Sequence, residues 1–266
     1  MGRAENTQVL SHLTDLVREI EQRDGVGRGR SDEPLATGWA AVDLVLGQGL
    51  ARGALHEWFG PDQFEPKPKR RNGRWHPPLC ILTQLAWQAV AQSRPPSGGW
   101  VFWVGPRCQV YPPALIREHG QGRQLLQHSI FLTPPNEATR LWAIELALRC
   151  AAVAAVVADG SKLTMAATRR LQLAAEAGGT IALIARPASE IDQLSAATTR
   201  WLIQRDRQLG QYSGRSGWTV QLLRCKGMRP IPEAQCSWAV EWDYVEGAVS
   251  VPAKLVDRPT AKTRSA

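Results

Sequence analysis

The segment that follows Gly60 has the start of a phosphate-binding loop but not its chemistry. A P-loop, G-x-x-x-x-G-K-[ST], wraps phosphates with backbone N–H groups, contacts the β/γ oxygens through its lysine and holds Mg²⁺ through its hydroxyl. Here Gly60 and Pro61 begin the pattern, but Glu65, Pro66 and Lys67 stand at the positions of the second glycine, the lysine and the hydroxyl residue. A proline offers no N–H to a phosphate, and a glutamate repels one. The sequence therefore predicts a degenerate nucleotide site with no catalytic residue, no metal and no cofactor.

A second position with chemical significance is Asp159, which ends the apolar run AAVVA at residues 154–158. A strand-terminal aspartate is a Walker B layout, in which the carboxylate holds the water shell of Mg²⁺. An aspartate before a glycine, here Gly160, is also an ordinary turn residue. Because the loop after Gly60 has no lysine at the phosphate position, we assign Asp159 to the same degenerate site.

The stretch that leads into this loop carries a dense motif. Residues 35–61, LATGWAAVDLVLGQGLARGALHEWFGP, fit the pattern L-x-T-G-x(4)-D-x(2)-L-G-x-G-L-x(2)-G-x-[LIV]-x-E-x-[FY]-G-P. This pattern is similar to the strand–turn–strand lead into the P-loop of RecA recombinases. Among RecA-like chains that have lost the P-loop, residues 35 to about 227 most resemble the ImuA family, accessory proteins of bacterial error-prone translesion synthesis. The stretch from Trp142 to Arg224 favours that family.

The resemblance implies a pseudo-ATPase rather than an enzyme. RecA-like ATPases place a glutamate base just after the second core strand, where this chain has no carboxylate across residues 104–108. They place a polar sensor where this chain has Arg186 and Pro187. The RecA DNA-binding loops also look short, at residues 160–163 and 186–196.

The resemblance also implies a role and partners. The role is SOS-induced, error-prone translesion DNA synthesis, performed by protein contact. The implied partners are an ImuB-like Y-family polymerase homologue and an error-prone replicative-type polymerase, with RecA as a further candidate.

Two other functions remain open from the sequence. An active DNA-dependent ATPase or recombinase-like protein would need an unrecognised phosphate site, for example Lys67 or Lys69 folding back. A SulA-type cell-division inhibitor has a similar fold and a different target, so the identity of the partner would distinguish it.

The composition indicates a globular chain: 44% of its 266 residues are hydrophobic, which suits one domain with extensions. No apolar run reaches the ~18 residues of a membrane span. The first ten residues lack an apolar signal core, so we expect a cytoplasmic protein. Five cysteines without C-x-x-C spacing argue against a disulfide framework and against zinc.

The net charge of +8 favours contact with polyanions, of which nucleic acid is the commonest in a cytoplasm. Cations gather in a proline-rich loop before Trp75 and around a hairpin near Trp201, where phosphate contacts and base stacking could combine into weak binding. The alternative is that these rings fill the edge of the core while the cations are solvated. The candidate DNA contacts are Lys67, Lys69, Arg70, Arg71, Arg74, Arg200, Arg205, Arg207 and Arg215.

An apolar stripe marks the N-terminal segment. Val9, Leu13, Val17 and Ile20 recur at helical spacing, and the charged, glycine-rich stretch DGVGRGRSDEP follows as a linker. The helix could pack on its own core or dock on a partner. These four residues are the candidate partner contacts.

Alternating strand and helix patterns predict an α/β fold class with a RecA-like, mostly parallel central sheet, flanking helices, antiparallel strands at one edge and an N-terminal helix. Strands and helices alternate up to residue 185, and three strand patterns follow without helices between them. The predicted organisation is an N-terminal amphipathic helix at 1–24, a linker at 25–34, a core at 35–246 with a loop insertion at 61–78, and a disordered basic tail at 247–266.

Overall fold

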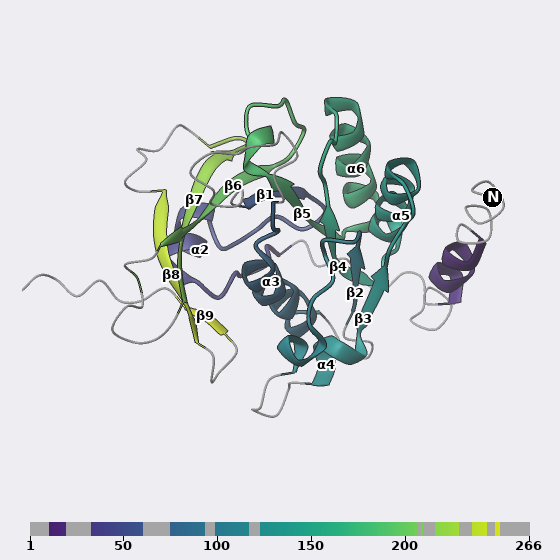
Figure 1. The fold of residues 1–266 in the computed structure, drawn as a ribbon, viewed down its shortest axis with the longest axis horizontal. Coiled ribbons are helices and arrows are strands. Elements are labelled where there is room, and N and C mark those ends of the chain that lie inside the picture. Colours follow the sequence, from purple (N-terminus) through teal and green to yellow (C-terminus); the bar gives the residue numbers. More distant parts are fainter. Residues whose placement is uncertain are drawn as a thin grey trace, which may run out of the picture.

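The fold is that of a computed structural model, which describes residues 11–19, 33–60, 75–93, 99–116, 123–206, 209, 216–228, 236–243 and 248–250. The predicted fold class is confirmed. Helices flank a mostly parallel sheet, antiparallel strands extend one edge, and residues 11–19 form a helix near the N-terminus (Figure 1). Within these ranges no helix is both long and apolar enough to cross a membrane.

The strands of the described residues form one nine-stranded sheet in the order β3-β2-β4-β5-β1-β6-β7-β8-β9. Their bounds are β1 Leu55–Gly60, β2 Trp100–Val104, β3 Ser129–Leu132, β4 Val153–Asp159, β5 Ile181–Pro187, β6 Thr199–Asp206, β7 Ser216–Cys225, β8 Ser237–Asp243 and β9 Ala248–Ser250. From β3 to β6 all neighbours are parallel, whereas β7, β8 and β9 are antiparallel additions. The carboxyl ends of β1, β2, β4 and β5 therefore meet at one edge, where ligands of open α/β sheets bind.

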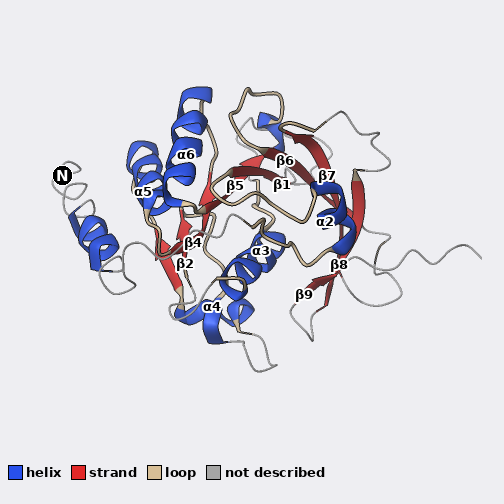
Figure 2. Ribbon diagram, turned by 180° about the vertical axis from the view of Figure 1, so that it is seen from behind, coloured by secondary structure: helices blue, strands red, loops and turns tan. Residues whose placement is uncertain are grey.

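Helices cover both faces of the parallel half (Figure 2). The labelled helices of the molecule are α2 Ala40–Leu46, α3 Leu79–Ala91, α4 Arg123–Gln127, α5 Glu137–Arg149 and α6 Met165–Gly178, with 3-10 turns at Pro112–Leu115 and Ala188–Glu190. One hydrophobic cluster joins α3 to one face of the sheet, and a second joins α5 and α6 to the other. Because successive strand residues point to opposite faces, β1, β2, β4 and β5 each contribute to both clusters.

Side-chain caps fix where α5 and α6 begin. The Asn136 side-chain oxygen Oδ1 accepts the backbone N–H of Thr139 at 2.9 Å, and the Thr164 hydroxyl accepts that of Ala167 at 3.2 Å. Thr164 is therefore the N-cap of α6.

Contacts between tryptophan rings connect the hydrophobic core of the parallel half of the sheet to that of the antiparallel half. Trp58 of β1 stacks on Trp201 of β6 with ring centroids 5.0 Å apart and planes within 5°. The ring centroids of Trp238 in β8 and Trp201 lie 6.2 Å apart. Offset aromatic contacts of this kind add to the stabilisation from burial.

The motif-rich lead segment differs from the strand–turn–strand prediction. A single bridge joins Leu35 to Leu50, and α2 lies between them. The helix ends where Gly47 adopts a left-handed conformation with φ 69°. The Asp43 carboxylate accepts the backbone N–H and the hydroxyl of Thr37 at 2.9 and 2.8 Å. These motif residues therefore hold the fold of this segment.

The predicted disordered C-terminal tail at 247–266 is wrong for three residues. Residues 248–250, assigned above to a disordered tail, form β9, because Val249 pairs with Trp242 of β8. The rest of that tail and most of the predicted linker at 25–34 lie outside the described residues.

Candidate functional site

The segment from Trp75 to Pro78 lies directly against the carboxyl end of β1. A Cβ added to Gly60 would lie 2.2 Å from the His76 carbonyl oxygen, so only glycine allows this approach. The neighbouring Trp75 is 6% exposed. The polypeptide itself therefore covers the place where a phosphate-binding loop would open. Residues 61–74, with the predicted site and DNA positions Pro61, Glu65, Pro66, Lys67, Lys69, Arg70, Arg71 and Arg74, lie outside the described residues.

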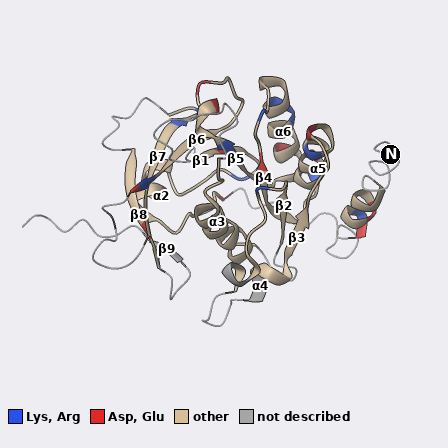
Figure 3. Cartoon of the chain, in the orientation of Figure 1, with Lys and Arg blue, Asp and Glu red and all other residues tan. Residues whose placement is uncertain are grey.

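The N-terminus of α3 is poorly equipped to bind an anion. Two residues without an N–H, Pro77 and Pro78, precede the helix, and the N–H of Leu79 donates to the Pro77 carbonyl at 2.8 Å. The next two N–H groups, of Cys80 and Ile81, lie against the Cys80 thiol. Burial raises the pKa of this thiol to about 12, although the two N–H groups oppose the shift. The helix also carries no Lys, Arg, Asp or Glu (Figure 3).

Asp159, at the end of β4, is fully buried and both of its carboxylate oxygens have partners. Oδ2 lies 3.0 Å from Arg107 Nη1 and 3.6 Å from Arg140 Nη1. Oδ1 accepts the backbone N–H and the hydroxyl of Ser161 at 3.0 and 2.7 Å. Two guanidinium groups thus face the single carboxylate that a Walker B layout would offer to Mg²⁺.

Arg107 links this carboxylate to the covering segment. Its guanidinium carbon lies 5.6 Å from the centre of the Trp75 ring, within cation–π range. Gly105, which follows β2, lets the backbone before Arg107 pass close to Asp159. A Cβ at this position would lie only 2.8 Å from the Asp159 Cβ. Arg107 belongs to the stretch at 104–108 where the resemblance places a glutamate base. A cation therefore stands in that stretch.

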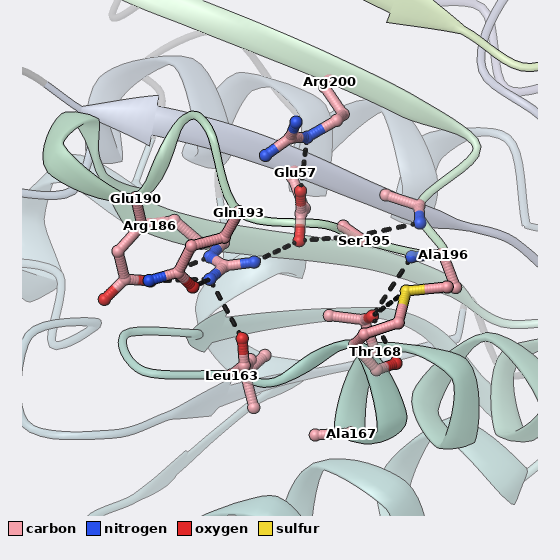
Figure 4. A network of polar contacts seen from close by, with 12 residues as sticks. Glu57, Leu163, Ala167, Thr168, Arg186, Glu190, Gln193, Ser195, Ala196 and Arg200 are labelled. Carbon is pink, nitrogen blue, oxygen red and sulfur yellow. Dashed lines mark hydrogen bonds and ion pairs between the residues drawn. The ribbon is translucent and has the colours of Figure 1, made fainter.

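A second buried network joins β5, β1 and β6 (Figure 4). Arg186 is 0% exposed, and its Nη1 lies 2.7 Å from Glu57 Oε1. Its Nε and Nη2 lie 3.0 and 2.7 Å from Glu190 Oε2, and Nη2 also donates to the Gln193 side chain at 2.6 Å and the Leu163 carbonyl at 3.0 Å. Arg186 was predicted only as a replaced sensor. In the fold it ties the loops after β4 and β5 to β1.

Arg200 closes the same network from β6. Its Nε donates to Glu57 Oε2 at 2.8 Å, and its guanidinium lies 4.8 Å from the centre of the Phe59 ring. The side chain is 12% exposed, which argues against the predicted DNA contact at Arg200. Arg205 is exposed, whereas Arg207 and Arg215 lie outside the described residues.

The two networks meet in the loop after β4. Ser161 binds Asp159, while its own carbonyl accepts Arg140 Nη2 at 2.8 Å. The Lys162 backbone N–H donates to Glu190 at 2.8 Å. Arginine–carboxylate contacts therefore join the carboxyl ends of β2, β4 and β5, and they extend to Glu57 within β1 and to Arg200 near the start of β6. The described residues contain no group of three or more His, Cys, Asp or Glu side chains that could hold a metal ion.

The candidate partner helix packs on its own chain. Leu13 and Val17 are 3% and 4% exposed and belong to the hydrophobic cluster of α5 and α6. The sequence left two possibilities open for this helix. Leu13 and Val17 pack on the core of their own chain, and they do not form a free apolar stripe. Val9 and Ile20 lie outside the described residues.

Fold and site together define the class: a mixed α/β protein with a mostly parallel sheet whose carboxyl edge is held by its own buried ion pairs. No family model matches the chain. It is similar to ImuA proteins from two strains of Caulobacter vibrioides, each 32% identical over 214 residues that cover 74% of this chain and 80% of the relative. The chain therefore belongs to the ImuA family.

Proposed function

We propose that this protein is a non-catalytic accessory factor of the error-prone DNA damage response, and that it acts in translesion synthesis through contacts with other proteins. Membership of the ImuA family supports the pathway. The proposed partners are an ImuB-like Y-family polymerase homologue and an error-prone replicative-type polymerase. RecA is a further candidate.

One observation carries the non-catalytic part of the proposal: Arg107 and Arg140 face the Asp159 carboxylate. A Mg²⁺ ion at this carboxylate would lie beside two guanidinium groups, and the charge of a bound ion must be counted in any such site. The two prolines before α3 and the close approach of His76 to Gly60 support the same conclusion, because they leave few backbone donors for phosphates.

The test is ATP hydrolysis by the purified protein, with and without single-stranded DNA. We expect no turnover above background, and equal background for Asp159→Asn and Arg107→Ala preparations. A turnover that persists through purification, is lost in Asp159→Asn and is kept in Arg107→Ala would establish a working ATPase and end this proposal. Intact folding of each variant is checked by circular dichroism.

A further inference from the structure

One face of the antiparallel half of the sheet is buried at its centre and partly open at its end. Strand register places Ile203 of β6, Val220 of β7 and Val240 of β8 on this face, and all three are fully buried. Nearer the β6–β7 connection, Trp218 and Trp242 belong to the same face but are only partly buried against the core cluster. Two indole rings therefore continue the core face towards solvent.

A cation stands beside these rings. Arg205 is exposed and lies directly opposite Trp218 in the β6–β7 pair, at a separation where cross-strand side chains interact. Trp242 lies opposite Ser216, two residues before Trp218, so the two tryptophans are diagonal neighbours on one face. One guanidinium and two indoles from three adjacent strands thus form a single surface.

The charges of these strands are divided between the two faces of the sheet. Asp206 and Glu241 both lie opposite Gly217, which puts them on the other face. Arg205 is the one charged residue that the described parts of β6, β7 and β8 place on the aromatic face, and it joins none of the ion pairs among the described residues. The neighbouring α2 has one charged residue, Asp43, whose carboxylate already accepts two hydrogen bonds.

A cation beside two partly open indole rings has the chemistry that single-stranded nucleic acid requires. Unpaired bases stack on aromatic side chains, while arginines contact the phosphates that join them. The net charge of +8 adds long-range attraction for a polyanion. A duplex keeps its bases stacked on one another, so this surface favours a single strand.

We propose that Arg205, Trp218 and Trp242 form the β6–β8 aromatic surface, which binds single-stranded nucleic acid by base stacking and a phosphate contact. This inference goes beyond the proposed function, which requires protein contacts only. Among the cations predicted from the sequence to contact DNA, it selects Arg205. It replaces the stacking position near Trp201, since that ring is 0% exposed and has no face open to a base.

The stacking part is tested by fluorescence anisotropy of a labelled oligothymidylate mixed with the purified full-length protein at low salt. Trp218→Leu and Trp242→Leu should each weaken binding about 5- to 100-fold, the range for loss of one base–aromatic stack. Trp218→Phe keeps a ring that stacks and should retain most of the affinity. Trp142→Leu is the matched control, because Trp142 is a partly buried tryptophan of α5, on the opposite face of the sheet.

The phosphate part is tested by the salt dependence of the same binding. Arg205→Gln should weaken binding and reduce the slope of log affinity against log salt by about 0.7, the value for one phosphate contact on a single strand. Arg169→Gln removes an exposed arginine from α6, on the other face of the sheet, and should leave the slope unchanged. Arg205 is exposed, so its replacement should not alter the melting temperature.

Three results would overturn the proposal and leave the proposed function standing. The first is a wild-type protein that does not bind the oligothymidylate, or binds an abasic oligonucleotide of the same length equally well. The second is equal affinity of Trp218→Leu, Trp242→Leu and the Trp142→Leu control. The third is an Arg205→Gln protein that keeps its oligonucleotide affinity but loses binding to the polymerase homologue, since the surface would then be a protein interface.

Discussion

Arg186 makes five polar contacts while fully buried, and so joins two strands and two loops through one side chain. Glu57 and Glu190 supply two negative charges, which the guanidinium groups of Arg186 and Arg200 balance. A buried ion pair is weak support for a fold when compared with apolar packing, but removal of one partner leaves an uncompensated charge. The network should therefore be sensitive to the loss of any single member.

We expect Arg186→Met to lower the free energy of unfolding by about 3–5 kcal/mol, because Glu57 and Glu190 would stay buried without their main cation. Urea denaturation at pH 7 measures the change. Arg205→Met, at an exposed position of β6, should change stability by less than about 0.5 kcal/mol. Equal, small effects of the two substitutions would show that the network contributes little.

His56 is a second buried residue with a defined protonation state. Nε2 lies 2.9 Å from the Ala51 carbonyl, which can only accept, so Nε2 carries the proton. Nδ1 then accepts the Thr199 hydroxyl at 2.7 Å, and that hydroxyl accepts Trp201 Nε1–H at 2.6 Å. Protonation of Nδ1 would break this chain of hydrogen bonds inside the core.

Burial lowers the pKa of His56 to about 4 from its ordinary value of 6.5, although the Ala51 carbonyl opposes the shift. Between these two values the unfolded chain binds a proton that the folded chain does not, so stability should fall as the pH drops from 6.5 to 4. The expected loss from this residue is about 3 kcal/mol. Urea titrations at pH 7 and pH 4 should show a smaller pH-dependent loss in His56→Gln than in the wild type. Identical losses would mean that another group titrates.

At the scale of elements, the N-terminal helix shows what periodicity can and cannot predict. The spacing of Leu13 and Val17 predicts one apolar stripe, but it does not say what covers that stripe. In the fold both residues are buried in the cluster of α5 and α6. This helix should therefore contribute to the stability of the core.

We expect Leu13→Asp to lower the free energy of unfolding by about 2–5 kcal/mol, since it leaves a cavity and places a carboxylate against apolar neighbours. Ser11→Asp, on the exposed side of the same helix, is the control and should be nearly neutral. Thermal melts of both variants make the comparison. If the Leu13→Asp protein were as stable as the control, the prediction would be wrong and this helix would again be a candidate partner surface.

Long elements were predictable and short ones were not. The five apolar residues of the strand Trp100–Val104 and the thirteen residues of the helix Glu137–Arg149 carry enough pattern to identify both elements from the sequence. Seven residues in α2 and five in α4 give too little periodicity to identify a helix. The four residues Pro112–Leu115 form only a 3-10 turn.

The candidate site was predictable only in its position. The end of an apolar strand identified Asp159, because carboxyl ends of parallel strands gather functional groups. Its partners Arg107 and Arg140 come from other elements, 52 and 19 positions earlier in the chain. Their meeting depends on the strand order and on the room that Gly105 leaves, which no local pattern encodes. Arg186 and Arg200 were assigned other roles for the same reason.

At the scale of the whole molecule, the sheet brings the carboxyl ends of its parallel strands to one edge, and arginine contacts hold the loops that follow β4 and β5. In a working ATPase this edge must admit Mg²⁺ and nucleotide, and its loops must respond to them. Here the guanidinium groups of Arg107 and Arg140 already meet the Asp159 carboxylate. The fold should therefore be stable without a nucleotide and unaffected by its addition.

This expectation leads to a thermal-shift prediction. A site with a dissociation constant one-hundredth of the ligand concentration would stabilise the fold by about 2.7 kcal/mol, which would raise the melting temperature by several degrees in a chain of this size. We expect 1 mM ATP with Mg²⁺ to leave the melting temperature unchanged within about 1 °C. Arg107→Ala should respond no differently, because Arg140 still faces Asp159 and the segment from Trp75 to Pro78 still covers the end of β1. A rise in the wild type would establish a nucleotide site, and a rise in Arg107→Ala alone would establish that Arg107 is an internal cation that keeps the site closed.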